Sequence, residues 1–509
     1  MKRQTIDIAQ PEITKQNEYT QKLNDYSERF RKREGRYPRY FIRTFGCQQN
    51  ESDSEVLAGI LVASGFEQAS KYEDADLSVI NTCSVRENAD NHLYGHLGIL
   101  KSLYQQDKHR LTAVCGCMLT QPQHVEKIRK SYSFVNLLFS PQDLYRFPEL
   151  LFNALEGNAA MQVAISEDDP IAEGLPVLRK RNYRALVSIM YGCDHYCTYC
   201  IVPYTRGRER SRKPSDILRE LNELGQEGFP EVMLLGQNVN AWGKDFKRRS
   251  IIDNQAPAVI DFADLLAASA QIDGLKRIRY MSPYPRDFTQ KVINTIGAYE
   301  NIEPHIHLPL QSGSNNVLRR MRRGYDRDKF IDIAKEARRA RPGLSITTDI
   351  IVGFPGETEQ DFEDTLRVME EVKFDSAFTF IYSPRPHTPA AAYTDQVDPD
   401  IVSKRFERLL ALQNQHSLEA NQALVGKQHE ILIEGVSSGN NQVLTGRTAD
   451  FKLINFSIPD HLRNELPPEA FTTENTLAGN FFEGKFCDVK LTNAKTFSIE
   501  GEMISSLRR

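Results

Sequence analysis

A chain of 509 residues, 40% of them hydrophobic and 26% charged, is long enough to form two or three separate cores. Its apolar runs are too short to cross a bilayer and its polar N-terminus does not resemble a secretory signal, so we expect a cytoplasmic protein without a membrane segment. The formal net charge of −4 means that any nucleic-acid contact has to use local basic patches. In a reducing compartment, the eight cysteines favour metal or cluster ligation over disulfides.

Residues 1–37 are rich in Lys, Arg, Glu, Gln and Asn and have few apolar positions. This composition predicts a mobile leader with one short helix at most. Strand and helix patterns then alternate over residues 38–156, which predicts a small parallel α/β domain. We expect its strands at 40–45, 76–81, 111–114 and 134–139, and its helices at 53–65, 89–106 and 123–131.

Three cysteines follow three of these strands by one or two residues, namely Cys47, Cys83 and Cys117. The ends of parallel strands meet at one edge of a sheet, so the three side chains are expected to come together there. Gly46 and Gly116 precede two of them and would let the backbone approach a bound cluster. Cys115 belongs to a strand and is a weaker candidate. Burial of all three cysteines in the sheet core is the alternative that the pattern leaves open.

Residues 179–412 repeat the strand–helix alternation six times, which predicts an incomplete (β/α)6 barrel with right-handed crossovers. In such barrels the active site lies at the C-terminal ends of the strands. The expected strands are 185–191, 231–235, 277–281, 305–310, 345–352 and 377–382, with helices at 214–227, 262–270, 288–295, 327–340 and 358–372.

The loop after the first of these strands carries a C-x3-C-x2-C motif formed by Cys193, Cys197 and Cys200. Three thiolates this close hold three irons of a cubane cluster and leave the fourth iron open for chemistry. Zinc fits less well, because tetrahedral zinc takes four side-chain ligands and neither cysteine triad has an obvious fourth. We expect His195, inside the loop, to face solvent or to be hydrogen-bonded.

Polar residues follow strand after strand on the rim that carries this loop. Taken singly, each one is better explained as an ordinary loop or helix-cap residue, and only their recurrence favours a functional interpretation. With Tyr199 of the cysteine loop, the candidates are Gln237, Asn238, Ser282, Gln311 and Asp349.

Short alternating strands punctuated by glycines over residues 415–505 predict a small all-β barrel. We expect strands at 429–434, 442–448, 452–456, 486–492 and 496–503. Small barrels often bind oligonucleotides, and Arg447 and Lys452 are candidate phosphate contacts, although a solvated surface explains them equally well. The same two interpretations apply to the basic run 206–213 and to Arg319, Arg320, Arg322 and Arg323.

The cysteine loop closely resembles that of radical S-adenosylmethionine (SAM) enzymes, and further motifs resemble the methylthiotransferases among them. The resemblance spans residue 39 to the C-terminus, and the first motif is most similar to the MiaB-type branch. Gln49 departs from that branch, which usually has Met there. The motifs are TFGCQQNESDSE at 44–55, NTC at 81–83, CGCM at 115–118, PYTRGR at 203–208, HLPLQSGS at 307–314 and TDIIVGFPGET at 348–358.

The resemblance implies two 4Fe-4S clusters. Cys193, Cys197 and Cys200 would hold the cluster whose open iron binds SAM, and Cys47, Cys83 and Cys117 would hold an auxiliary one. Tyr199 and the five rim residues then become candidates for the SAM pocket. The C-terminal barrel would be a TRAM module that holds tRNA. No catalytic residue beyond the cluster ligands is suggested.

The implied reaction is methylthiolation at carbon 2 of N(6)-dimethylallyladenosine at position 37, next to the anticodon. One SAM would methylate cluster-bound sulfur and a second would give a 5′-deoxyadenosyl radical, because the target C–H is too inert for acid–base chemistry. The base has to be unpaired and splayed out of its loop. Implied partners are the tRNA anticodon loop, an electron-donor protein and a sulfur or cluster-repair system, and we expect a monomer.

Two other functions remain open at this point. Within the same family, the substrate would be threonylcarbamoyl-adenosine in tRNA or a ribosomal-protein side chain. In a different class, the chain would be a non-catalytic iron–sulfur RNA-binding protein, which would form no 5′-deoxyadenosine from SAM.

Overall fold

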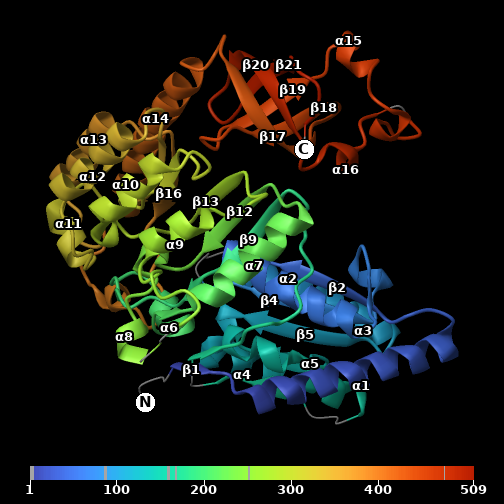
Figure 1. Cartoon of the computed structure of the whole chain (residues 1–509). Helices are drawn as coiled ribbons and strands as arrows, with labels where there is room; N and C mark the ends of the chain where they lie inside the picture. The colour runs from blue at the N-terminus through green and yellow to red at the C-terminus, as the bar shows by residue number, and fades with distance from the viewer. Residues whose placement is uncertain are drawn as a thin grey trace.

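The computed structural model describes residues 5–84, 89–157, 161–166, 169–249, 251, 253–474 and 476–508. Figure 1 shows an α/β part formed by the first third of the chain, a central α/β part and a small red β-barrel at the C-terminal end. This arrangement confirms the fold class expected from the sequence. Among the described residues, no helix is both long and apolar enough to cross a membrane.

The N-terminal part is built on a parallel sheet of six strands in the order β3-β2-β4-β5-β6-β7. Its central strand β4 is buried throughout, and apolar clusters cover both faces of the sheet. The strands are β2 (Arg39–Thr44), β3 (Glu67–Gln68), β4 (Leu77–Thr82), β5 (Leu111–Gly116), β6 (Leu137–Phe139) and β7 (Gln162–Ala164). The helices between them are α2 (Gln48–Ala63), α3 (Ala89–Gln106), α4 (Pro122–Ser131) and α5 (Phe147–Leu155).

The segment expected as a mobile leader with at most a short helix instead contains the long helix α1 (Gln10–Glu34), while residues 1–4 lie outside the described part of the chain. Leu23 of this helix is fully buried, and Ser27 Oγ donates to the carbonyl of Ser64 at 2.7 Å. The ring of Tyr19 lies 5.7 Å from that of Phe152 on α5. Few apolar residues are therefore enough here, because they recur at helical spacing on the face that packs.

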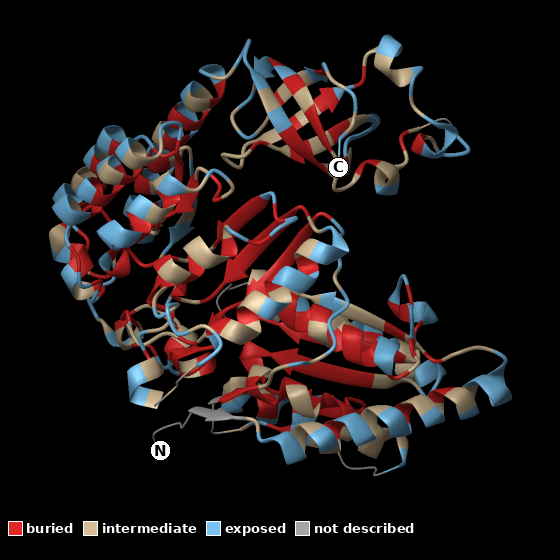
Figure 2. Cartoon of the chain, viewed as in Figure 1, coloured by how far each residue is buried: buried red, intermediate tan, exposed pale blue. Residues whose placement is uncertain are grey.

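The central part holds six parallel strands in two three-stranded sheets, ordered β13-β12-β9 and β14-β15-β16. These strands are β9 (Arg184–Ser188), β12 (Glu231–Leu235), β13 (Arg277–Tyr280), β14 (His305–His307), β15 (Ser345–Val352) and β16 (Ser376–Ile381). The helices include α7 (Pro214–Glu227), α9 (Phe262–Ser269), α10 (Gln290–Ala298), α11 (Asn315–Arg320), α12 (Arg327–Ala340) and α13 (Glu359–Val372). Figure 2 shows buried strands lined by helices with exposed outer faces.

Several expected strands differ in extent, and those expected at 134–139 and 496–503 begin only at Leu137 and Ile499. The strand expected at 185–191 is divided, because Met190–Tyr191 (β10) leaves the parallel sheet and pairs antiparallel with Arg210–Ser211 (β11). This pairing forms the base of the cysteine loop. The strand expected at 305–310 ends at His307.

The long helix α14 (Pro399–Gln422) was not predicted from the sequence, and it leads into a closed β-barrel. The barrel strands, in their order around it, are β17 (Gln428–Ser437), β18 (Asn440–Arg447), β19 (Leu453–Ser457), β21 (Ile499–Met503) and β20 (Phe486–Ala494). The turn between β18 and β19 docks on the central part. Arg279 donates to the carbonyl of Ala449 at 3.0 Å, and Ser345 Oγ donates to that of Asp450 at 2.7 Å. Because Ser345 begins β15, the barrel covers the N-terminal ends of the central strands.

Candidate functional site: two cysteine triads

The loop that carries Cys193, Cys197 and Cys200 is fixed by its own backbone. A Cβ atom at Gly192, where φ is 75°, would lie 2.1 Å from the carbonyl oxygen of Arg208, so only glycine fits between β10 and the returning strand. Cys193 N–H donates to the carbonyl of Gly207 at 3.1 Å. Cys197 is buried, and Cys193 and Cys200 are half-buried. The backbone therefore turns three thiols toward one region at the rim of the central strands.

Arg323 lies against this triad with only 4% of its surface exposed. Its Nη1 donates to Cys197 Sγ at 3.4 Å and to the hydroxyl of Tyr199 at 3.2 Å. Burial raises the pKa of Cys200 to about 12, so the free thiol holds its proton. Binding of iron would replace that proton, because a metal holds cysteine as the thiolate.

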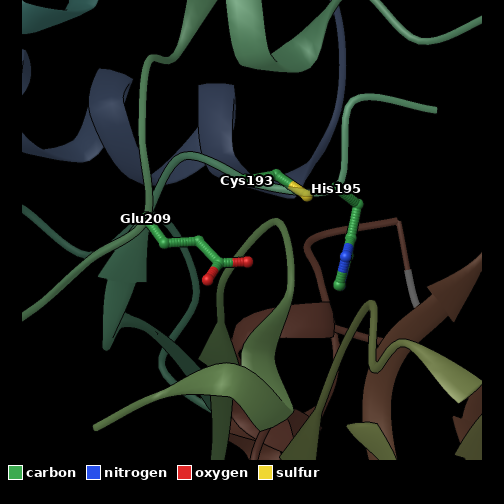
Figure 3. Close-up of side chains that lie close together, drawn as sticks. All are labelled: Cys193, His195 and Glu209. Atoms are coloured by element: carbon green, nitrogen blue, oxygen red, sulfur yellow. The ribbon is translucent and has the colours of Figure 1, made fainter. Parts of the chain in front are cut away.

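His195 lies close to Cys193 and Glu209, with one possible ligand atom from each within 4.8 Å of the others (Figure 3). The histidine is already engaged, because its Nδ1 lies 3.0 Å from Arg286 Nη2 and its Nε2 lies 2.9 Å from Asp287 Oδ2. Nε2 also lies 2.9 Å from Asn238 Nδ2, so both ring nitrogens have partners and neither is free for a metal. The expectation of a hydrogen-bonded His195 is confirmed.

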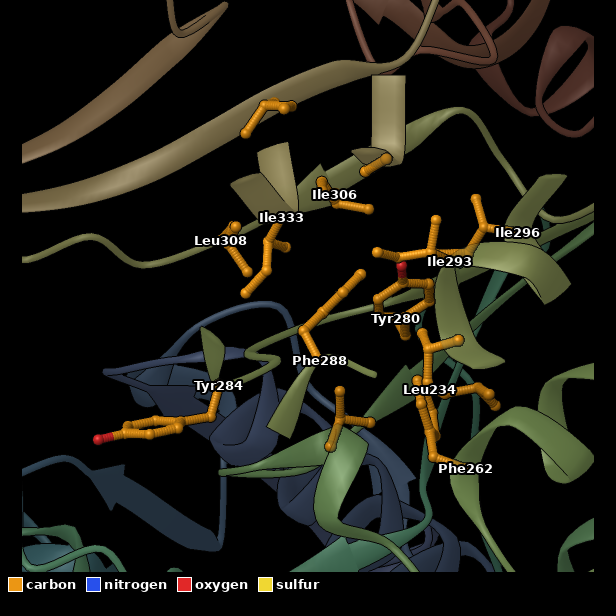
Figure 4. Packing of buried hydrophobic residues seen from close by; sticks show 14 of the residues in the cluster. Leu234, Phe262, Tyr280, Tyr284, Phe288, Ile293, Ile296, Ile306, Leu308 and Ile333 are labelled. Atoms are coloured by element: carbon orange, nitrogen blue, oxygen red, sulfur yellow. The ribbon is translucent and has the colours of Figure 1, made fainter. Parts of the chain in front are cut away.

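The His195 ring also stacks on Tyr284, with ring centroids 3.6 Å apart. Tyr284 belongs to the main apolar cluster of the central part, and in Figure 4 its hydroxyl is directed away from the other labelled residues. That hydroxyl lies 4.0 Å from Cys197 Sγ. The packed core of the central part thus positions the cysteine loop through Tyr284.

Cys47, Cys83 and Cys117 lie at the C-terminal edge of the N-terminal sheet. A Cβ atom at Gly46 would lie 2.7 Å from Cys83 Cβ, and one at Gly116 would lie 2.2 Å from the carbonyl oxygen of Thr82. A hydrogen bond with Cys83 lowers the pKa of Cys47. The two glycines therefore permit the close approach of the strand ends that carry Cys47, Cys83 and Cys117.

The two remaining cysteines lie elsewhere. Cys115 belongs to β5 and to the apolar cluster on one face of the N-terminal sheet. Cys487 is buried in the core of the C-terminal barrel. Both are packing residues.

An arginine that closely follows the Cys193 loop in the chain contacts the dispersed triad. The short helix α6 (Val202–Thr205) follows Cys200 and ends at Arg206, whose Nε donates to Cys117 Sγ at 3.0 Å. Arg206 Nη2 also donates to Asp53 Oδ2 at 2.6 Å, and the guanidinium is 4% exposed. Both triads and their donor residues thus fit two clusters held on either side of α6.

The polar rim candidates divide into two groups. Gln237 accepts a hydrogen bond from the backbone N–H of Gly192 and donates to Gln49 Oε1 at 3.3 Å, so it adjoins both cysteine loops. Asn238 is fully buried and donates to Glu209 Oε1 at 2.8 Å, which gives it a part in holding the loop.

The other rim candidates come from later strands. Ser282 and Gln311 adopt φ angles of 61° and 69°, a conformation uncommon for residues other than glycine. Gln311 N–H donates to the carbonyl of Asp349 at 2.8 Å, so these two residues are neighbours. Asp349 Oδ1 lies 3.4 Å from His307 Nε2.

Gln49, the position that departs from the MiaB-type pattern, donates to Ser188 Oγ at 2.7 Å and is 5% exposed. Together with the Gln237 contact, it gives the boundary between the N-terminal and central parts a hydrogen-bonded link. An amide is therefore used at this position where an apolar side chain would make no such bonds.

Most of the basic residues expected at phosphates or in solvent are neither. Arg212 is 9% exposed and pairs with Glu173 and Glu220, both at 2.8 Å. Lys452 pairs with Asp375 at 2.7 Å at the boundary with the C-terminal barrel. Arg206, Arg210 and Arg323 are likewise buried, whereas Arg319 and Arg322 are exposed. Sequence reasoning missed that most of these arginines bind sulfur, carboxylates or carbonyls, because a run of charges does not show which members face inward.

Comparison with known proteins agrees with this geometry. Residues 187–369 match the Radical SAM superfamily, and residues 39–140 match a family described as uncharacterized protein family UPF0004. The fold resembles a cobalamin- and [4Fe-4S]-bound radical SAM methyltransferase, TsrM of Kitasatospora setae, with a TM-score of 0.51 and 14% identity over 69% of this chain and 77% of that one. The chain is thus a radical SAM enzyme, a class defined by a 4Fe-4S cluster and SAM.

Its curated relatives are more specific. It is 42% identical to the tRNA-2-methylthio-N(6)-dimethylallyladenosine synthase of Alkaliphilus oremlandii over 99% of both chains. It is also 42% identical to that of Acetivibrio thermocellus over 99% of this chain and 98% of the relative. The chain belongs to the tRNA-2-methylthio-N(6)-dimethylallyladenosine synthase family of radical SAM methylthiotransferases.

Proposed function

We propose that this enzyme adds a methylthio group to carbon 2 of N(6)-dimethylallyladenosine at position 37 of tRNA. The observation that carries the proposal is the pair of cysteine triads on either side of α6, with Arg206 at the end of that helix donating to Cys117. A single-cluster radical enzyme would need only the Cys193 triad. Sulfur insertion requires a second cluster beside the first, and the names of the relatives give the substrate.

Cys193, Cys197 and Cys200 would hold the cluster that binds SAM, and Cys47, Cys83 and Cys117 would hold the auxiliary cluster. When bound, the clusters and SAM supply an organic radical for hydrogen abstraction and the sulfur that is transferred. The chain's own residues position these groups. Arg323 and Arg206 donate to one sulfur of each triad, Cys197 and Cys117, at 3.4 and 3.0 Å, so a guanidinium holds one ligand side chain of each set in place.

The SAM pocket would lie on the rim beside the Cys193 loop. Tyr199, Gln237 and Gln311 are its best-placed members, because they adjoin the loop or the ends of β14 and β15. Ser282 and Asp349 complete the rim. Asn238 acts through Glu209 and the loop, so it is a positioning residue.

Single cysteine variants test the division of labour. Cys193→Ala is expected to abolish 5′-deoxyadenosine formation from SAM under reducing conditions. Cys47→Ala is expected to keep that cleavage but to stop methylthiolation of tRNA, measured by mass spectrometry of its nucleosides. The matched control is Cys487→Ala in the C-terminal barrel, which should keep the iron content of the wild type. A Cys47→Ala enzyme that still methylthiolates tRNA contradicts the proposal.

The substrate is tested by offering three targets to the wild-type enzyme: tRNA with N(6)-dimethylallyladenosine, tRNA with threonylcarbamoyl-adenosine, and ribosomal protein. We expect the added methylthio mass on the first alone. The proposal further includes the tRNA anticodon loop, an electron-donor protein and a sulfur or cluster-repair system as partners, a TRAM-type role in tRNA binding for the C-terminal barrel, and a cytoplasmic location where tRNA is available.

A further inference from the structure

Strand β16 exposes two large aromatic side chains that no other element covers among the described residues. Phe378 is 58% exposed and Phe380 is 49% exposed, although both lie in a strand of the central part. The parallel register pairs Phe378 with Asp349 and Phe380 with Ile351 on β15. Burial of a large apolar side chain is favourable, so two phenylalanines left open call for a partner.

The register also shows which side of the sheet these rings occupy. Ile350 and Val352, which alternate with Asp349 and Ile351 on β15, belong to the buried cluster between the strands and their helices. Paired residues of adjacent parallel strands point to the same side of a sheet. Phe378 and Phe380 therefore face the inner side of the strands, away from the helices.

Polar groups lie at one border of the exposed surface formed by Phe378 and Phe380, which we call the aromatic wall. The ring of His307 lies 5.8 Å from that of Phe378 at an angle of 68°, and His307 Nε2 lies 3.4 Å from Asp349 Oδ1. Asp349 also adjoins Gln311 on the rim that carries the candidate SAM pocket. The wall is thus continuous with the proposed active site.

We propose that Phe378 and Phe380 form the wall on which the target adenine of tRNA stacks, with its apolar N(6) branch against Phe380 and its polar edge toward Asp349 and His307. This inference rests on the proposed function. Stacking suits a flat base, and an exposed phenyl suits a branched hydrocarbon, so the two rings match both halves of the nucleoside named in the relatives. The adenine of SAM carries no such branch and leaves the second ring unexplained.

The test uses the cluster-loaded enzyme and two synthetic anticodon stem-loops, one with N(6)-dimethylallyladenosine and one with unmodified adenosine. Phe378→Ala is expected to weaken binding of both stem-loops by about five- to 140-fold, the range for loss of one base–aromatic stack. Phe380→Ala is expected to weaken binding of the prenylated stem-loop more than that of the unmodified one. SAM cleavage without RNA is measured in both variants as well, because it separates a wall for the target adenine from a wall for the adenine of SAM.

Ile381→Ala provides a matched control, since Ile381 is also 49% exposed on β16 but pairs with Val352 on the helix side. It should change neither affinity. Unchanged stem-loop affinity in both phenylalanine variants overturns the inference. So does loss of SAM cleavage with RNA binding retained, because that result would assign the wall to the adenine of SAM. Failure of the wild-type enzyme to methylthiolate the prenylated tRNA would instead refute the proposed function.

Discussion

Arg206 is an enclosed cation shared by Asp53 of the N-terminal part and Cys117 of the dispersed triad. The bond to Asp53 Oδ2 is 2.6 Å long, and the guanidinium is 4% exposed. Arg206→Met keeps much of the side-chain volume but leaves a buried carboxylate without its cation. Removal of one partner of a buried pair costs about 3–5 kcal/mol, so the free energy of unfolding should fall by that amount in urea denaturation.

Arg208 gives the comparison, because it lies two residues away and pairs with Asp194 at 2.9 Å while 45% of its side chain is exposed. Arg208→Met should cost less than about 1 kcal/mol, since solvent screens the pair. In the double variant Arg206→Met with Asp53→Asn, part of the lost stability should return. Equal losses of stability in Arg206→Met and Arg208→Met would show that the buried carboxylate of Asp53 does not depend on Arg206.

Glu357 couples three elements, because it lies in the connection from β15 to α13 and contacts α14. Its Oε2 accepts from Gly353 N–H at 2.9 Å and from Arg405 Nη1 at 3.1 Å. Burial raises the pKa of Glu357 to about 7, from an ordinary value of 4.5. The folded chain therefore binds this proton more tightly than the unfolded chain does. The resulting stability is complete below pH 4.5 and is lost as the pH rises through about 7.

Glu357→Gln cannot titrate but keeps an acceptor oxygen. As the pH rises from 5 to 8, the unfolding free energy of the wild type should fall by up to about 3 kcal/mol more than that of the Glu357→Gln variant. Urea denaturation at several pH values measures both. Glu359→Gln serves as the control. Glu359 bonds the same Arg405, and that hydrogen bond lowers its pKa, so it titrates below this range. Identical slopes for the wild type and Glu357→Gln would contradict the assignment.

Helix α1 is held to the N-terminal part by a narrow apolar face. Leu23 on that face is fully buried. Leu23→Ala should lower the unfolding free energy by about 2–5 kcal/mol, the usual cost of a buried leucine, and calorimetry would measure it as a lower melting temperature. Glu18→Ala on the exposed side of the helix should stay within about 0.5 kcal/mol of the wild type. If both variants melt alike, the helix does not contribute to the stability of the sheet.

Periodicity predicted most elements well, because strands such as β4 and β12 are buried on both sides and helices such as α7 carry regular apolar stripes. It failed for one helix with a weak apolar pattern and for one strand whose partner is distant in the sequence. Helix α1 has only a few apolar residues along 25 positions, and β10 leaves its sheet because of an antiparallel partner nineteen or more residues downstream that no local pattern reveals.

The site was predictable to the same degree. Motif spacing located the cysteines, because each expected cluster ligand is a single residue that can be recognised in the sequence. The donors to their sulfurs were not foreseen, since the burial of Arg206 and Arg323 depends on contacts such as Asp53 that lie more than a hundred residues away. The role of Phe378 was hidden for a similar reason, because an alternating strand does not show which of its faces is covered.

At the scale of the molecule, the two ends of the central strands have different neighbours. Their C-terminal ends adjoin the N-terminal part through Gln49 and Arg206, while the C-terminal barrel covers their N-terminal ends. An RNA that contacts both the cysteine rim and the C-terminal barrel therefore has to run along the side of the central part. The edge strand β16, with Phe378 and Phe380, lies on such a path.

Phe451 anchors this arrangement, because its ring stacks on His305 with centroids 5.0 Å apart and lies 4.5 Å from the guanidinium of Arg279 and 4.3 Å from that of Arg447. Arg184 also lies over this ring at 5.5 Å, so Phe451→Ala removes one aromatic contact and three cation–π contacts, together worth about 2–5 kcal/mol. We expect faster amide exchange in residues 448–452 and at the start of β15, with strands β20 and β21 unchanged. Phe497→Ala, at a ring 76% exposed on the same barrel, should change none of these rates. Faster exchange throughout the barrel after Phe451→Ala would show that the ring stabilises the barrel itself, whereas a local effect would establish it as the residue that holds the barrel on the strand ends.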